Sequence, residues 1–223
     1  MSLPVYSLIE VYPSLYLAKI EDQFDQALLF CRYCEWQESP YPNINHQSFK
    51  FLDLVKTYTI NSKWLTFDYM SWGGYNVPST NILACSATIP TGDRNIYDDL
   101  MSAIATQINK PSSPWYLIGV TKEGGGGAYD TYYHEACHGL YFLDANYKLS
   151  ADNITNSISP GLYHMLQVGL SSNDYGLNVT NDEIQAYMST GPSVFRGIIK
   201  DLTSAQKIEY KQKRTQYVNL YRS

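Results

Sequence analysis

The stretch TYYHEACHGL, residues Thr131–Leu140, decides how the rest of the chain is interpreted. His134 and His138 stand four residues apart in it, and Glu135 follows the first histidine. On a helix, residues i and i+4 lie on one face, one turn apart, so the two imidazoles can take two corners of a tetrahedral zinc site. Glu135 projects to a side from which it can reach a metal-bound water and accept its proton. The stretch therefore predicts a zinc-binding helix with Glu135 as general base.

The residues around the histidines strengthen this interpretation. Thr131 stands three residues before His134, the positions next to the histidines are uncharged apart from Glu135, and Leu140 is hydrophobic. The stretch resembles the extended HExxH signature of the zincin metallopeptidases, and the similarity runs from about Trp115 to Tyr187. It implies a zinc-dependent peptidase that acts on a peptide or protein substrate. The alternative is a surface helix with incidental histidines, although the chain has four histidines and two of them occupy this spacing.

A third ligand must come from elsewhere, because catalytic zinc usually takes three protein ligands and a water. Downstream candidates are His164, Asp182 and Glu183. Glu183 and Ala186 resemble the ExxA helix of gluzincin peptidases, which implies Glu183 as the third ligand, with His164 as the main alternative. A second interpretation of Glu183 stays open, because residues 180–183, TNDE, also form a capping box that would stabilise a helix start without any metal.

The sequence departs from the thermolysin group of gluzincins at one position. That group carries an aspartate four residues after the ligand glutamate, where it supports a histidine ligand, and this chain has Tyr187 there. The supporting hydrogen bond must then come from another group, and Asp144 or a backbone carbonyl is the expected source.

Catalysis would also need a donor to the oxyanion of the substrate. His164 is the first candidate, with Tyr163 and Tyr187 as alternatives, and we expect Tyr187 to contact substrate. A capping or core role is the competing interpretation of His164.

Four glycines precede the metal helix at positions 124–127. A phosphate-binding loop would need a lysine and a serine or threonine after the last glycine, and the sequence has Ala128-Tyr129-Asp130 instead. In zincins an edge strand beside the metal helix binds extended substrate by main-chain pairing. Gly125 and Gly126 are therefore expected to bind substrate as the rim of the site, and a plain connector is the alternative.

The composition sets further limits. Hydrophobic residues make up 44% of the 223-residue chain and charged residues 17%, which indicates a globular protein. The net charge of −5 argues against a general nucleic-acid binder. Seven basic residues after Phe195 predict a solvated helix face, with a nucleic-acid or membrane-surface role as the alternative. Cys31 and Cys34 lack the partners of a structural zinc site, so buried thiols are expected.

No signal peptide and no run of about 20 apolar residues is present, so we expect a cytoplasmic protein without a membrane span. The order of elements predicts an α+β fold of the zincin type, with a small sheet packed beside the HExxH helix and a mostly helical C-terminal half. We expect one zincin-like domain over 1–223, divided into an N-terminal part (1–95), a metal-site core (96–190) and a C-terminal helical segment (191–223). A catalytically idle zincin-like binding or structural protein is the alternative function.

The local patterns predict individual elements. Helices are expected over 21–36, 48–59, 92–110, 159–170, 180–190 and 203–221. The expected caps are Asp93, Ser159 followed by Pro160, and Thr203 in a capping box with Gln206. Strands are expected over 63–70, 81–89 and 115–122, and a loop over 71–80.

Overall fold

The computed structural model describes residues 4–39, 41–61, 73–110, 112–120, 128–172, 175, 179–191 and 193–223. The chain divides into two compact units, Met1–Tyr132 and Tyr133–Ser223, and the division falls inside helix α5 (Ala128–Leu143). Neither expected boundary, at 95 or at 190, coincides with it, and the single-domain organisation stays a prediction. Each unit is described separately below.

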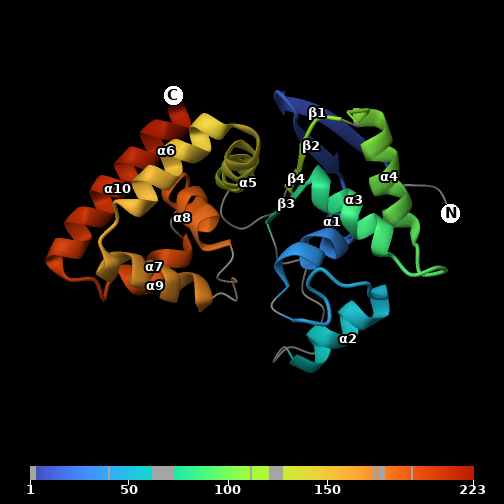
Figure 1. The fold of residues 1–223 in the computed structure, drawn as a ribbon, viewed down its shortest axis with the longest axis horizontal. Coiled ribbons are helices and arrows are strands. Elements are labelled where there is room, and N and C mark those ends of the chain that lie inside the picture. Colours follow the sequence, from blue (N-terminus) through green and yellow to red (C-terminus); the bar gives the residue numbers. More distant parts are fainter. Residues whose placement is uncertain are drawn as a thin grey trace. The chain divides into compact units, whose positions relative to one another are not determined.

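The first unit contains a small mixed sheet, which confirms the expected α+β class (Figure 1). Its strand order is β1-β2-β4-β3. Strands β1 and β2 pair antiparallel, β2 and β4 parallel, and β4 and β3 antiparallel. The strands span Tyr6–Tyr12 (β1), Leu15–Ile20 (β2), Gly74–Pro78 (β3) and Tyr116–Val120 (β4).

Helices α1 (Gln23–Glu38), α3 (Ser79–Thr88) and α4 (Ile96–Ile108) lie together on one side of this sheet (Figure 1). A further helix, α2, spans Phe51–Asn61. The Asp22 side chain caps α1 by accepting from the backbone N–H groups of Phe24 and Asp25, which would otherwise lack partners. The shared core includes Phe30, Tyr75, Ile82, Leu100 and Leu117. Cys31 and Cys34 are buried free thiols, as expected.

Several expectations for the first unit are wrong or incomplete. Residues 81–89 form most of helix α3 rather than a strand, because Ile82 and Cys85, three residues apart, are the positions buried in the core. Part of the expected loop is strand β3. The hairpin β1–β2 is missing from the expectations altogether. The strand expected over 63–70 lies outside the described residues.

The cap of α4 is Asn95, not Asp93. Asn95 accepts from the backbone of Tyr97 and Asp98, and the Asp98 side chain accepts from the Asn95 N–H, which completes a capping box. Asp93 instead pairs with the buried guanidinium of Arg32 at 3.0 Å. Arg32 also lies 3.3 Å from Asp98, so one fixed cation ties α1 to the start of α4.

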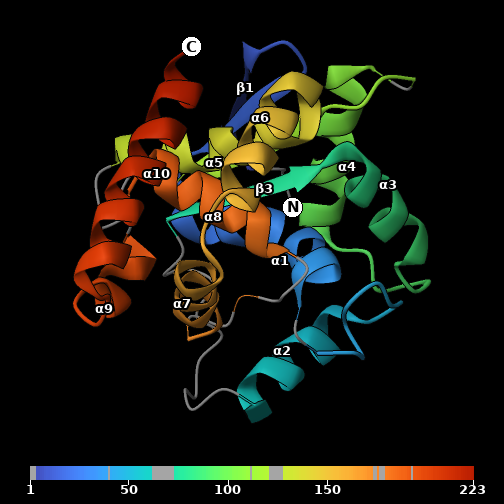
Figure 2. The same ribbon diagram turned by 60° about the vertical axis from the view of Figure 1, so that its left-hand side comes forward.

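The described elements of the second unit are all helical, as expected for the C-terminal half. Helix α8 contacts α6, α7 and α10, and it lies among them in Figure 2. Their core includes Leu162, Leu166, Ile184, Met188 and Phe195. The helices span Ala145–Asn156 (α6), Pro160–Ser171 (α7), Thr180–Ser189 (α8), Arg196–Ile199 (α9) and Ser204–Arg222 (α10), with a short 3-10 helix at Ser193–Phe195.

The predicted starts of two of these helices are confirmed. Ser159 caps α7 with Pro160 in its first turn, and Thr203 with Gln206 forms the capping box of α10. Among the described residues, no helix combines the length and the apolar character needed to cross a membrane.

A close approach of other side chains to Gly119 in the first unit generates a stability prediction. A Cβ on Gly119 of β4 would lie 2.6 Å from Cε2 of Phe30 and closer still to the Gln26 amide. Gln26 cannot move aside cheaply, because its buried side chain bonds the backbone of Ala18 and Ile20. We expect Gly119→Ala to lower the free energy of unfolding by about 1–3 kcal/mol.

Tryptophan fluorescence during urea unfolding measures this change, because all four tryptophans precede residue 133. The control is Gly197→Ala on α9, where an added Cβ meets nothing within 4 Å, and far-UV circular dichroism follows its unfolding because the second unit contains no tryptophan. Equal transition midpoints for wild type and Gly119→Ala would contradict the prediction.

Candidate metal centre

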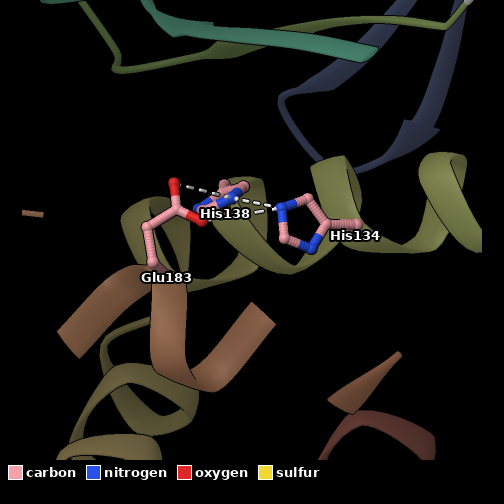
Figure 3. A group of neighbouring side chains, drawn as sticks. All are labelled: His134, His138 and Glu183. Carbon is pink, nitrogen blue, oxygen red and sulfur yellow. Dashed lines mark hydrogen bonds and ion pairs between the residues drawn. The ribbon is translucent and has the colours of Figure 1, made fainter. Parts of the chain in front are cut away.

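Helix α5 presents both histidines of the HExxH stretch to one place. The His138 side chain is buried and the His134 side chain nearly so, with 3% and 13% exposed. Glu135 is buried on the same helix. Figure 3 shows the two rings one turn apart, each with its Nε2 edge turned toward the same point. The helical spacing predicted from sequence therefore brings the two rings together.

Helix α8 supplies the third member, Glu183. Its carboxylate is buried and turned toward both rings (Figure 3). The capping interpretation of Glu183 is wrong in this structure, because α8 starts after Val179 and no side chain caps that end. Thr180 is already inside the helix. Glu183 therefore lies within the first turn of the helix rather than at a capping box. Its side chain is buried beside the histidines.

The three side chains form a candidate ligand group. One ligand atom from each of His134, His138 and Glu183 lies within 4.8 Å of the others. The two Nε2 atoms are 3.2 Å apart. Each carboxylate oxygen faces one histidine, at 3.7 Å from its Nε2. Tetrahedral zinc with Zn–N bonds of about 2.0–2.1 Å needs ligand atoms roughly 3.3 Å apart, so a small rotation of the carboxylate would complete the group.

Asp182 holds the other edge of His138. Its Oδ1 lies 2.9 Å from Nδ1 of His138, which donates to it. This bond fixes the proton on Nδ1 and leaves the Nε2 lone pair for a metal ion. The expected partner Asp144 is wrong for this role, because Asp144 instead caps α6 through the backbone of Asn146 and Tyr147. The sequence predicts Asp182 only as a candidate ligand, because nothing in its spacing shows that its carboxylate meets Nδ1.

The carboxylates also set the charge of the two rings. Burial alone would lower the pKa of His138, but the Asp182 and Glu183 carboxylates outweigh it and hold that pKa well above its usual value. Burial, and then the charge on His138, lower the pKa of His134 well below its usual value. A protonated His138 beside a neutral His134 explains how two Nε2 atoms can lie at hydrogen-bond distance without a metal.

A pair of tyrosines lies next to this group. The Tyr187 ring packs on His134 with 4.3 Å between ring centroids, and the Tyr187 hydroxyl bonds that of Tyr175 at 2.7 Å. Burial and then the charge of Glu183 raise the pKa of both hydroxyls, so both stay protonated at neutral pH. The sequence does not predict that Tyr175 lies at this site, because its surroundings contain no recognisable motif.

The remaining predicted site residues lie elsewhere or outside the described part. His164 is exposed on α7 and does not belong to the ligand group, which contains Glu183 instead. Its role as oxyanion donor stays a prediction. The Tyr163 hydroxyl donates to Asn181. Gly125 and Gly126 lie outside the described residues.

The residues present fit a zinc ion chemically. Two imidazole nitrogens and one carboxylate oxygen form a donor set that zinc takes in catalytic sites. The buried side chains of His138 and Glu183, with the partly buried His134 beside them, would be costly in one place without a cation among them. In the described part of the chain, the buried Nδ1 of His134 has no hydrogen-bond partner, so that ring is held by packing and by the group at its Nε2 edge.

The bond between Asp182 and His138 generates a prediction for metal affinity. Asp182→Asn replaces the charged acceptor by a weaker neutral one, so we expect zinc affinity to fall about 10- to 100-fold. Competition with a chromogenic chelator measures it. Asp152→Asn is the matched control, because Asp152 is equally exposed (29% against 30%) and pairs with Lys148 and Tyr141, away from the ligand group. Equal affinities of the two variants would contradict the prediction.

Comparisons with known proteins find no match to this chain. The chain matches no protein-family model, and the searches of curated proteins and of solved structures return no match. The similarity to the zincins therefore rests on the HExxH frame, and the case for a metal on the geometry of the residues around it.

Proposed function

We propose that this protein is a zinc-dependent peptidase in which His134, His138 and Glu183 hold the ion. The observation that carries the proposal is the convergence of three ligand atoms from two helices, with the Nε2 atoms 3.2 Å apart and one carboxylate oxygen facing each. Glu135, beside the first histidine, supplies the acid–base group that peptide hydrolysis requires. Support for the zincin class comes from the HExxH frame.

Each protein group has a separate task in the proposed reaction. A zinc ion held by His134, His138 and Glu183 would supply Lewis acidity, which would polarise the scissile carbonyl and lower the pKa of the attacking water. Glu135 accepts the proton of that water and then delivers it to the leaving amine. Asp182 keeps the proton of His138 on Nδ1, so that Nε2 stays a ligand atom.

The tyrosine pair is the proposed donor to the substrate oxyanion. Two bonded hydroxyls share one hydrogen bond but carry two protons, so one O–H remains to donate. Tyr187 packs directly on His134, which favours it over His164, an exposed side chain outside the ligand group.

Glu135→Gln tests the proposal. The amide keeps the shape of the side chain but cannot accept the proton, so we expect zinc content to stay near one ion per chain while peptide cleavage falls by about 100-fold or more. Metal content is measured by mass spectrometry of the purified protein, and cleavage by product analysis of a random peptide library.

The control for this variant is Glu21→Gln, at an exposed position of the first unit. Wild type that purifies without chelators and carries far less than one ion per chain would overturn the metal site. Wild type that binds zinc yet cleaves no peptide would favour the catalytically idle binding protein instead.

The tyrosine pair generates a second prediction. Tyr187→Phe removes the hydroxyl that would stabilise charge on the transition state, so we expect kcat to fall about 100-fold with little change in zinc affinity. Tyr163→Phe is the control, because its hydroxyl is committed to Asn181. If Tyr163→Phe lost more activity than Tyr187→Phe, the assignment of the donor would be wrong.

A further inference from the structure

A buried amide stands behind the carboxylate that holds His138. Gln185 on α8 is completely buried. Its Nε2 donates to Oδ1 of Asp182 at 3.0 Å, and its Oε1 accepts from the Tyr147 hydroxyl at 2.9 Å. A chain of hydrogen bonds therefore runs from Tyr147 on α6 through Gln185 and Asp182 to Nδ1 of His138.

The donor and the acceptor of each hydrogen bond in this series follow from the chemistry of the groups. The Tyr147 hydroxyl stays protonated, because burial raises its pKa far above neutral. It meets an amide oxygen, so it donates. The opposite amide orientation would turn Oε1 of Gln185 toward the Asp182 carboxylate, and two acceptors repel each other. Oδ1 of Asp182 therefore receives two donors, the amide of Gln185 and Nδ1 of His138.

We infer that Gln185 and Tyr147 are positioning residues of the metal centre, which hold Asp182 in the place and orientation that keep Nε2 of His138 available as a ligand. The inference rests on the proposed zinc site and adds to it two residues outside the ligand group.

Packing alone does not explain a glutamine at this position. Its neighbours Ile184 and Ala186 are fully buried, and Tyr147 and Ile184 belong to the same hydrophobic core. An apolar side chain of equal length would fill the space without the cost of burying an amide. The amide is instead satisfied at both ends, and one end meets the residue that bonds a metal ligand.

The test uses the full chain with zinc as the probe. Gln185→Met keeps the length of the side chain and removes both hydrogen bonds, and we expect zinc affinity to fall about 10-fold in chelator competition. Tyr147→Phe is the more conservative variant and should lower affinity in the same direction by less. Both variants should weaken the protected Nδ1–H proton signal of His138 in the NMR spectrum of the zinc-loaded protein.

Tyr217→Phe is the matched control. It removes a buried tyrosine hydroxyl that bonds Thr155 at 2.6 Å in the same core. We expect it to lower stability while leaving zinc affinity and the His138 proton unchanged. This control separates loss of a buried hydrogen bond from loss of the link to the metal ligand.

A double-mutant cycle tests whether Gln185 affects zinc affinity through Asp182. If Gln185 acts through Asp182, then Gln185→Met should have little further effect on zinc affinity in an Asp182→Asn background. An undiminished 10-fold effect in that background would overturn the inference. So would a Gln185→Met protein that binds zinc as tightly as Tyr217→Phe, and this result would leave the proposed zinc site intact. Wild type that binds no zinc would overturn both.

Discussion

In the second unit, the two edges of the His138 ring face the carboxylates of two consecutive residues of α8. Successive residues of a helix project about 100° apart. Asp182 therefore reaches Nδ1 while Glu183 faces Nε2. This arrangement removes the need for an aspartate one turn after the ligand glutamate, and that position is occupied by Tyr187, which packs on His134 instead. One helix start thus supplies both a candidate ligand, Glu183, and the residue that bonds His138, Asp182.

In the two units, carboxylates lie beside different partners. The partner is a guanidinium group in the first unit and histidine rings in the second. In the first unit, Asp93 and Asp98 face the guanidinium group of Arg32. In the second unit, carboxylates face histidines, whose proton can be exchanged for a metal ion. The first cluster is therefore suited to joining two helices, and the second is suited to binding a cation.

Burial strengthens every electrostatic interaction at the candidate metal centre, because water screens it little. The same burial raises the pKa of the Tyr175 and Tyr187 hydroxyls, so they act as donors and not as anions. This site combines a candidate metal-ligand group, a buried carboxylate in Glu135 and neutral hydroxyl donors. These are the parts that hydrolysis by an activated water requires.

The sequence by itself determined the features that depend on local spacing. The spacing of His134 and His138 put both rings on one helical face, Thr203 with Gln206 capped α10, and the apolar run of β4 formed a buried strand. Only the tertiary structure decided that Glu183 is buried beside the histidines rather than capping α8, and that Asp182 supports His138. Local patterns allow either role for an acidic residue near a helix start, and only the packing of α8 against α5 brings the carboxylates to the rings.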